Sequence, residues 1–263
     1  MTVSLSPMID AFELQTTLDS LLQPQLFKDY CPNGMQVEGR RAVYKLVTGV
    51  TASLALIEAA IDEQADAILV HHGLFWRGYD GRVTGWMRKR LALLLNHNVN
   101  LYAYHLPLDA HPELGNNAQL GSRLGLVALE GAAGRFGEQS LGWLGRPGQG
   151  AGFESAAQLA RHLEHVLKRP VTLVEPAQAA IKTIAWCTGG AQGYFEAAIA
   201  AGADAFITGE ISEPQAHLAR ECGVAYLACG HHASERFGAP AVGDRMAQQF
   251  GLSHRFIDID NPA

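Results

Sequence analysis

The sequence predicts an α/β protein built from two related lobes, each a mixed sheet flanked by helices. Apolar runs of strand length alternate with amphipathic helical segments in both halves of the chain. The strand runs, such as 67–70 and 99–104, are almost entirely apolar, which is typical of strands buried on both faces. The two halves also share local sequence identity, which indicates an internal duplication.

The first half supplies its elements in a β-α-β-α-β order after an opening helix predicted over 8–23. A loop is expected at 31–39, because Pro32 cannot continue a helix and Asn33-Gly34 is a strong turn signal. The remaining predicted elements are a strand over 42–51, a helix over 53–65, a strand over 66–73, a helix over 87–98 and a strand that begins at 99.

The second half repeats this order, with predicted strands over 181–190, 204–210 and 223–235, and helices over 191–203 and 213–222. A shift of 138 residues, from Glu58 to Glu196, gives seven identities within the ten positions 58–67. We therefore expect a first lobe at 1–125, a connecting segment at 126–180 that contains one clear helix, and a second lobe at 181–263, together forming one intertwined unit.

Composition and charge exclude several classes of protein. The chain has 263 residues, 48% of them apolar, and a net charge of −6, without the basic cluster that nucleic-acid binding requires. The N-terminus has neither a basic start nor an apolar core, and no window reaches the ~18 consecutive apolar residues of a membrane helix. The four cysteines lie outside any CxxC pattern. These features predict a cytoplasmic protein with reduced thiols and no membrane or nucleic-acid partner.

Five of the eleven histidines are expected at the ends of apolar strands: His71, His72, His105, His231 and His232. Ligands of open α/β sheets bind beyond the carboxyl ends of the strands. In the second half, Gly209 and Glu210 take the positions of His71 and His72, so the histidine pair indicates a function added to one lobe. A histidine pair alone is more often a surface or core feature, but this joint placement favours a metal site.

Acidic residues follow two of these histidines at helical spacing. Asp109 comes four residues after His105, although Pro107 makes a helix there doubtful, and Glu235 comes four residues after His231. Imidazoles and carboxylates without a convergent thiolate suit Zn, Mn, Fe, Co or Ni. Neighbouring strand residues diverge, so the histidine pair would serve two ions, which a carboxylate can bridge. Glu210 is a further candidate, as a residue that hydrogen-bonds to a metal ligand, as an acid/base or merely as a capping acid.

Six sequence blocks resemble the Nif-three-like dinuclear-metal family, whose members are labelled homologues of GTP cyclohydrolase 1 type 2. The blocks are PNGMQVEG, TGVTAS, VHHGLFW, HLPLDAHPELGNN, DAFITGE and GHHASE, and the similarity is greatest to short bacterial members. The resemblance implies two divalent ions held by His71, His72, Asp109, His231 and a bridging Glu235. It also implies homohexameric rings, as trimers of dimers.

Two hypotheses for the function follow. In the first, the protein is a metal-dependent hydrolase of a nucleotide-like or other small substrate, with His105, His232 or Glu210 as candidate proton-transferring residues. The family label suggests GTP, although no phosphate-binding motif or other cofactor site accompanies it. In the second, the protein is a non-catalytic metal carrier, a metallochaperone or a ring-shaped binding scaffold. The metal-site chemistry alone does not choose between them.

Overall fold

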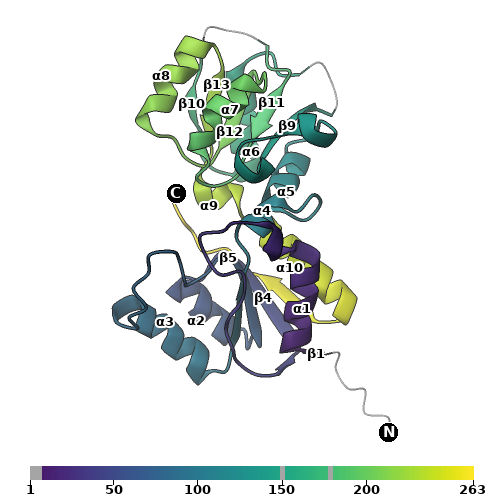
Figure 1. The fold of residues 1–263 in the computed structure, drawn as a ribbon, viewed down its shortest axis with the longest axis vertical. Coiled ribbons are helices and arrows are strands. Elements are labelled where there is room, and N and C mark those ends of the chain that lie inside the picture. The colour runs from purple at the N-terminus through teal and green to yellow at the C-terminus, as the bar shows by residue number, and fades with distance from the viewer. Residues whose placement is uncertain (1–7, 149–151, 177–179) are drawn as a thin grey trace. The chain divides into compact units, whose positions relative to one another are not determined.

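The computed structural model describes residues 8–148, 152–176 and 180–263. The chain divides into two compact units, one running to Gly115 and including Gly238–Asp260, and the other formed by Asn116–Phe237 and Asn261–Ala263. Each unit contains a mixed sheet with helices packed against it, so the α/β class is confirmed (Figure 1). Residues 1–7, on which part of the expectation for the N-terminus depends, lie outside the described residues.

The main sheet of the first unit has the strand order β14-β4-β5-β6-β2. The strands β14, β4, β5 and β6 run parallel to one another, and β2 is antiparallel to β6. A small antiparallel pair, β1–β3, accompanies it. The elements of this unit are β1 Ile9–Asp10, α1 Ala11–Leu22, a 3₁₀ turn Pro24–Leu26, β2 Gly34–Val37, β3 Ala42–Val43, β4 Lys45–Thr51, α2 Leu54–Asp62, β5 Ala67–His72, α3 Gly85–Asn96, β6 Asn100–Ala103, α4 Leu106–Ala110, α10 Gly238–Phe250 and β14 Ser253–Phe256.

Helices cover both faces of this sheet, which explains why its central strands are mostly apolar. Leu46 on β4 packs in a cluster with α1 and α10, whereas the adjacent Val47 packs in a cluster with α2 and α3. Successive strand residues point to opposite faces, so each run of apolar residues supplies both cores. Figure 1 shows α2 and α3 on one side of β4 and β5, and α1 and α10 on the other. The carboxyl end of β5 is thereby held rigidly from two sides.

The prediction of a loop over 31–39 was wrong in part, because β2 occupies Gly34–Val37. This short strand pairs with β6 at the sheet edge and contains a register irregularity between Met35 and Val37. The turn signal itself is confirmed by Gly34, whose φ of 110° lies in the region that favours glycine. An edge strand of four residues lacks the long apolar run on which strand prediction depends.

The sheet of the second unit has the order β10-β13-β12-β11-β9-β7, with β8 also paired to β9. Its central strands β11, β12 and β13 are parallel, and the flanking strands β9 and β10 are antiparallel to them. The elements are α5 Asn116–Arg123, β7 Leu126–Ala128, 3₁₀ turns Gly131–Gly134 and Glu138–Ser140, β8 Arg135–Phe136, β9 Gly142–Pro147, α6 Ala156–Leu167, β10 Thr172–Val174, β11 Ile184–Trp186, a 3₁₀ turn Gln192–Tyr194, α7 Phe195–Ala200, β12 Ala205–Thr208, α8 Glu213–Cys222, β13 Ala225–Ala228 and α9 His231–Ser234.

The core of the second unit is again two-sided. On one face, Leu163 of α6 packs in a cluster with Trp186 and Leu227 of the sheet. On the other, the Phe195 ring of α7 contacts Phe206 and Tyr226, at centroid distances of 5.8 and 4.8 Å. Complete burial of a side chain of this size contributes ~1.5–3 kcal/mol. The strand ends that carry Glu210 and His231 therefore extend from a well-packed sheet.

The β-α-β segments of the two units correspond at the shift of 138 residues. Leu46 pairs with Ala67 between β4 and β5, and Ile184 pairs with Ala205 between β11 and β12. Asp66 accepts hydrogen bonds from the backbone N–H groups of residues 44 and 45, at 2.8 and 3.0 Å. Asp204 accepts the equivalent bonds from residues 182 and 183, at 2.9 and 2.8 Å. In each unit, the Asp that follows the helix therefore hydrogen-bonds to the start of the preceding strand.

The limits of the packed units differ from the lobe limits that we expected. The segment 238–260 was assigned to the second lobe, but α10 packs on β4 and β14 pairs with β4, both in the first unit. Residues 116–125, expected in the first lobe, belong to the second unit. The chain therefore passes between the units at positions that no change of composition marks.

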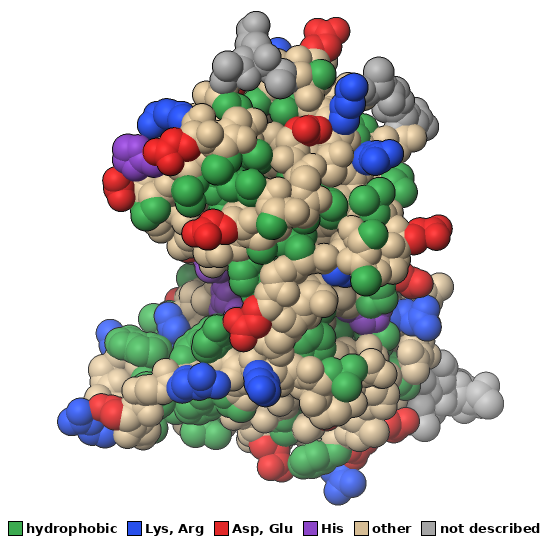
Figure 2. Space-filling model, turned by 45° about the horizontal axis from the view of Figure 1, so that its top comes forward, with side chains coloured by type: hydrophobic (Ala, Val, Ile, Leu, Met, Phe, Trp, Pro, Cys, Tyr) green, Lys and Arg blue, Asp and Glu red, His purple; other side chains and the backbone are tan. Residues whose placement is uncertain are grey.

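The distribution of charged side chains and the character of the helices can be compared with the expectations from composition. Acidic and basic side chains are interspersed on the face drawn in Figure 2. Within the described residues, no helix combines the length and the apolar character needed to cross a bilayer. The four cysteines are free thiols, and Cys31, Cys187 and Cys229 are buried.

Candidate metal centre

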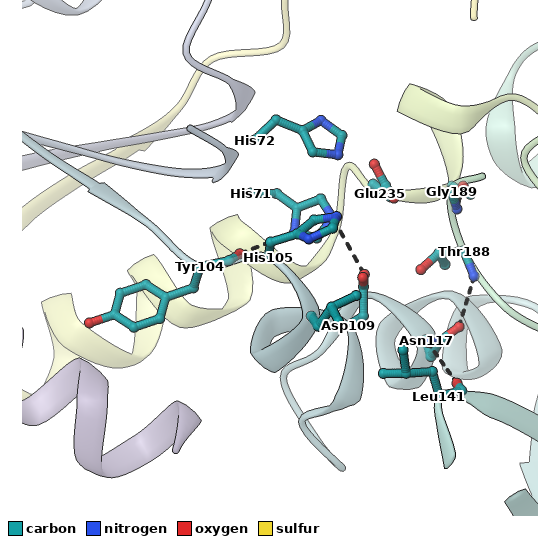
Figure 3. A network of polar contacts seen from close by, with 12 residues as sticks. His71, His72, Tyr104, His105, Asp109, Asn117, Leu141, Thr188, Gly189 and Glu235 are labelled. Carbon is teal, nitrogen blue, oxygen red and sulfur yellow. Dashed lines mark hydrogen bonds and ion pairs between the residues drawn. The ribbon is translucent and has the colours of Figure 1, made fainter. Parts of the chain in front are cut away.

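His71 and His72 end β5, where the sheet stops and the chain turns away. His71 is completely buried and His72 is half-buried. Strand alternation predicted that the rings diverge, but their centroids lie 4.5 Å apart with an interplanar angle of 43°. At the strand end both side chains are therefore presented in the same region of the first unit (Figure 3).

The hydrogen bonds of His71 define which nitrogen can serve as a ligand. Its Nδ1 lies 3.1 Å from the backbone oxygen of Tyr104, which can only accept, so the Nδ1–H donates. The lone pair therefore belongs to Nε2. The Nδ1 of His72 is also engaged, 3.0 Å from Thr51 Oγ1, a hydroxyl that can donate or accept. Metal-binding histidines commonly use one nitrogen for such a partner and offer the other to the ion.

Asp109, on α4, faces the Nε2 of His71. Its Oδ1 lies 3.5 Å from His71 Nε2, and its side chain is largely buried. The doubt about a helix at 105–109 is resolved, because α4 begins directly after His105 and Pro107 occupies its first turn. Proline is tolerated there, since the first-turn N–H groups have no intrahelical acceptor. A carboxylate oxygen opposed to an imidazole lone pair is an arrangement that a cation stabilises.

His105 joins the histidine pair within the first unit. One ring nitrogen from each of His71, His72 and His105 lies within 4.8 Å of the other two. The His105 ring centroid lies 5.0 Å from that of His71 and 5.1 Å from Trp76, which meets it edge-on. The predicted proton-transfer candidate therefore lies beside the proposed ligands.

In the second unit, His231 lies between two carboxylates. Its Nδ1 is 2.7 Å from Glu210 Oε1, and its Nε2 is 3.3 Å from Glu235 Oε2. Burial lowers the pKa of His231, but Glu235 and Glu210 outweigh this and raise the pKa to about 9. Glu210 therefore occupies the orienting position behind His231, and Glu235 faces the nitrogen that a metal would take.

Two glycines allow this arrangement in the second unit. A Cβ at Gly189 would lie 2.0 Å from Glu235 Oε1, and the φ of Gly189 is 71°. A Cβ at Gly209 would lie 2.6 Å from the backbone of His231. Gly209 corresponds to His71, so the second unit needs a glycine where the first carries a ligand. This gives a steric reason for the difference between the two halves.

Several residues that support the candidate site were not predicted. Gln192 Nε2 donates to Glu210 Oε2 at 3.0 Å, and Asp29 accepts a hydrogen bond from His105 Nδ1 at 2.7 Å. Asp29 lies just before the loop predicted over 31–39, and no role was expected for it. His232, the remaining candidate, is buried, and its backbone N–H donates to the oxygen of Ala263. The predicted ligands thus form a group in each unit: His71, His72 and Asp109 in the first, and His231 and Glu235 in the second.

Comparisons with known proteins agree with these features. The family model for Duf34/NIF3 (NGG1p interacting factor 3) matches residues 9–262. A protein of Allochromatium vinosum named GTP cyclohydrolase 1 type 2 homolog is 51% identical over 256 residues, covering 97% of this chain and 98% of its own. A Pseudomonas aeruginosa protein of the same name is 48% identical over 266 residues, and the match covers both chains completely.

Solved structures share the fold over nearly the whole chain. One titled protein ybgI, of unknown function, has a TM-score of 0.90 and 42% identity, covering 97% of this chain and all of the other. The TTHA1606 protein of Thermus thermophilus has a TM-score of 0.83 and 33% identity, with the same coverage. Taken with the family model and the identities of about 50%, these likenesses show that the chain belongs to the Duf34/NIF3 family.

Proposed function

We propose that the protein binds two divalent metal ions and is a metal-dependent hydrolase of a nucleotide-like or other small substrate. The proposed ligands are His71, His72, Asp109, His231 and Glu235, with Glu235 as the bridge. The metal would be Zn, Fe, Mn, Co or Ni, since the donors are imidazoles and carboxylates.

One observation carries this proposal: in each unit an imidazole Nε2 faces a carboxylate while the Nδ1 of the same ring is already engaged. In the first unit the pair is His71 and Asp109, at 3.5 Å. In the second it is His231 and Glu235, at 3.3 Å. Such pairs fit a divalent cation, and the partners behind them, Tyr104 O and Glu210, fit the outer shell of a metal site.

The chemistry then divides between the ions and the protein. Bound divalent ions lower the pKa of water towards neutrality and polarise a substrate oxygen. Glu210 would keep the His231 ring oriented through Nδ1. His105 lies beside the histidine pair in the first unit, and His232 and Glu210 of the second unit are the other candidates for proton transfer. The names of the relatives support a nucleotide such as GTP as the first substrate to test.

The direct test is turnover by protein reconstituted with Zn, Mn or Fe, against GTP, other nucleotides and phosphoesters. The proposal predicts hydrolysis that Asp109→Asn abolishes. Glu213→Gln is the matched control, because Glu213 forms an exposed pair with His217 at 2.9 Å, four residues away. Absence of turnover on the whole panel by fully loaded protein would contradict the hydrolase.

The second candidate is a metal carrier, which the 29% exposure of the His231 side chain favours. A carrier would transfer its metal to an apo-acceptor within seconds and show no turnover. Transfer is measured by mixing loaded protein with an excess of a chromophoric chelator. Retention of the metal together with turnover would favour the hydrolase.

We also propose cytoplasmic homohexamers, arranged as trimers of dimers, and an origin of the two units by duplication. Exposed apolar side chains such as Phe12 and Trp86 suit subunit contacts. The matching strand register and the equivalent hydrogen bonds of Asp66 and Asp204 support duplication. Sedimentation should give six times the chain mass of 28.3 kDa, and a monomer would contradict the assembly.

A further inference from the structure

The His105 ring is held by a loop that the proposed function does not use. Asp29 Oδ1 accepts from His105 Nδ1 at 2.7 Å and from the Tyr30 backbone N–H at 2.6 Å. Asp29 Oδ2 accepts from the Leu106 backbone N–H at 2.9 Å and from Asn33 Nδ2 at 3.0 Å. Four donors therefore converge on one largely buried carboxylate.

Asn33 completes this attachment from the same loop. Its Oδ1 accepts from the His105 backbone N–H at 2.7 Å, while its Nδ2 donates to Asp29. The loop thus binds both the backbone and the ring of His105 at the end of β6. The His105 side chain is only 15% exposed, and Trp76 packs edge-on against its ring. The ring has little freedom to rotate.

The charge of Asp29 determines the tautomer of His105. Both oxygens of Asp29 accept from groups that can only donate, namely the backbone N–H groups of Tyr30 and Leu106, and these contacts favour the ionised carboxylate. An ionised carboxylate can only accept, so the proton of neutral His105 must lie on Nδ1. Nε2 then carries a lone pair, and it is the ring nitrogen still able to act on a ligand near His71 and His72.

A separate metal site at this place is disfavoured. Asp29, Cys31 and His105 do offer ligand atoms within 4.8 Å of one another. However, both oxygens of Asp29 are engaged by the four donors named above, and the bond to His105 uses Nδ1. The hydrogen-bond pattern is that of a carboxylate that orients a histidine.

We infer that Asp29 and Asn33 are positioning residues that hold His105 as its Nδ1–H tautomer, so that Nε2 accepts a hydrogen bond from the ligand of the adjacent metal site. The ligand would be a metal-bound water or a substrate carrying an O–H or N–H group. The role of Nε2 toward a ligand rests on the proposed function, whereas the tautomer of His105 does not depend on it.

The tautomer is tested by ¹⁵N–¹H long-range correlation spectra of protein labelled with ¹⁵N-histidine, without metal and with Zn. The wild type should show a protonated Nδ1 and an unprotonated Nε2 for His105. Asp29→Asn should lose this preference for the Nδ1–H tautomer. The Asn side chain has an NH₂ group in place of one carboxylate oxygen, and this group would face N–H donors that need an acceptor. Asp80→Asn, an exposed Asp paired with Arg82, is the control and should leave the spectrum unchanged.

Acetohydroxamate, which binds metal and carries O–H and N–H groups, tests the acceptor role by calorimetry. Its Kd for the Zn-loaded protein should rise about 10-fold in Asp29→Asn and in His105→Phe, because each variant would lose about one hydrogen bond to acetohydroxamate. It should not change in Asp80→Asn. An unchanged Kd would overturn the acceptor role.

The spectra separate this inference from the proposed function. A wild-type His105 protonated at Nε2 would overturn the tautomer assignment even if two metals bind. Because this result comes from the wild-type protein, the tautomer can be tested even if the Asp29→Asn variant does not fold. The expected tautomer in a protein that binds no metal would instead contradict the proposed function alone.

Discussion

At the scale of single residues, each proposed metal-binding nitrogen belongs to a ring whose other nitrogen already has a partner. The partners are the Tyr104 carbonyl for His71, Thr51 for His72 and Glu210 for His231. Rings held in this way lose little rotational freedom when a ligand binds, so more of the binding energy is retained. The orientation of the donors is therefore built into the fold.

Gly189→Ala should displace Glu235 and weaken metal binding. The new Cβ would lie 2.0 Å from Glu235 Oε1, and the φ of 71° adds backbone strain. Gly202→Ala is the matched control, because its φ of 81° carries similar strain but no atom lies within 4 Å of the new Cβ. Chelator competition should show metal loss in Gly189→Ala only. Equal metal affinity in both variants would show that Glu235 is not a ligand.

Asp29 should make the stability of the metal-free protein depend on acid pH. Its pKa is held at about 2 in the folded chain, below the usual 3.8, so its contribution is fully present above pH 3.8. The contribution is lost as the pH falls towards 2, and on the order of 2 kcal/mol is involved. Urea unfolding of Asp29→Asn between pH 2 and 5 should show a flatter dependence than the wild type. Identical slopes would contradict this role.

The sequence could supply the identity of the candidate ligands but not the partners that orient them. His71, His231 and Glu235 stand out by residue type and position at strand ends. The partner of His71 is a backbone carbonyl, which no side chain marks. Asp29 lies 76 residues from His105 along the chain, so no local pattern connects them.

At the scale of elements, the central strands and the helices that follow them were predictable because they are buried on both faces. The edge strands were not, since β14 is half exposed and only four residues long. The helix α4 was doubted because of Pro107, although proline suits a first helical turn. Short elements at sheet edges depend on pairing with distant residues, which periodicity does not record.

His254 should stabilise the attachment of α10 and β14 to the sheet. Its Nε2 lies 2.9 Å from the buried Thr48 Oγ1 on β4, and its Nδ1 lies 2.7 Å from Asp244 on α10. His254→Leu should lower the free energy of unfolding by ~1–3 kcal/mol, because Thr48 loses a buried partner. Asp244→Asn should cost below about 1 kcal/mol, since Asp244 is exposed. Equal losses in urea unfolding would contradict the importance of the Thr48 contact.

At the scale of the whole molecule, the chain builds one unit from its beginning and its end. The return of Gly238–Asp260 to the first unit could not be predicted, because β14 pairs with a strand about 200 residues earlier. The similarity of the two β-α-β segments, in contrast, was visible as sequence identity, and the two segments have equivalent strand registers.

The most direct test of this account is the metal content per chain, measured by elemental mass spectrometry after reconstitution with Zn, Mn or Fe. The account predicts two ions per wild-type chain, the loss of both in Glu235→Ala, and retention of both in Glu213→Gln. Fewer than about one ion per wild-type chain would contradict the dinuclear centre. Two tightly held ions in Glu235→Ala would contradict the assignment of Glu235 as the bridge.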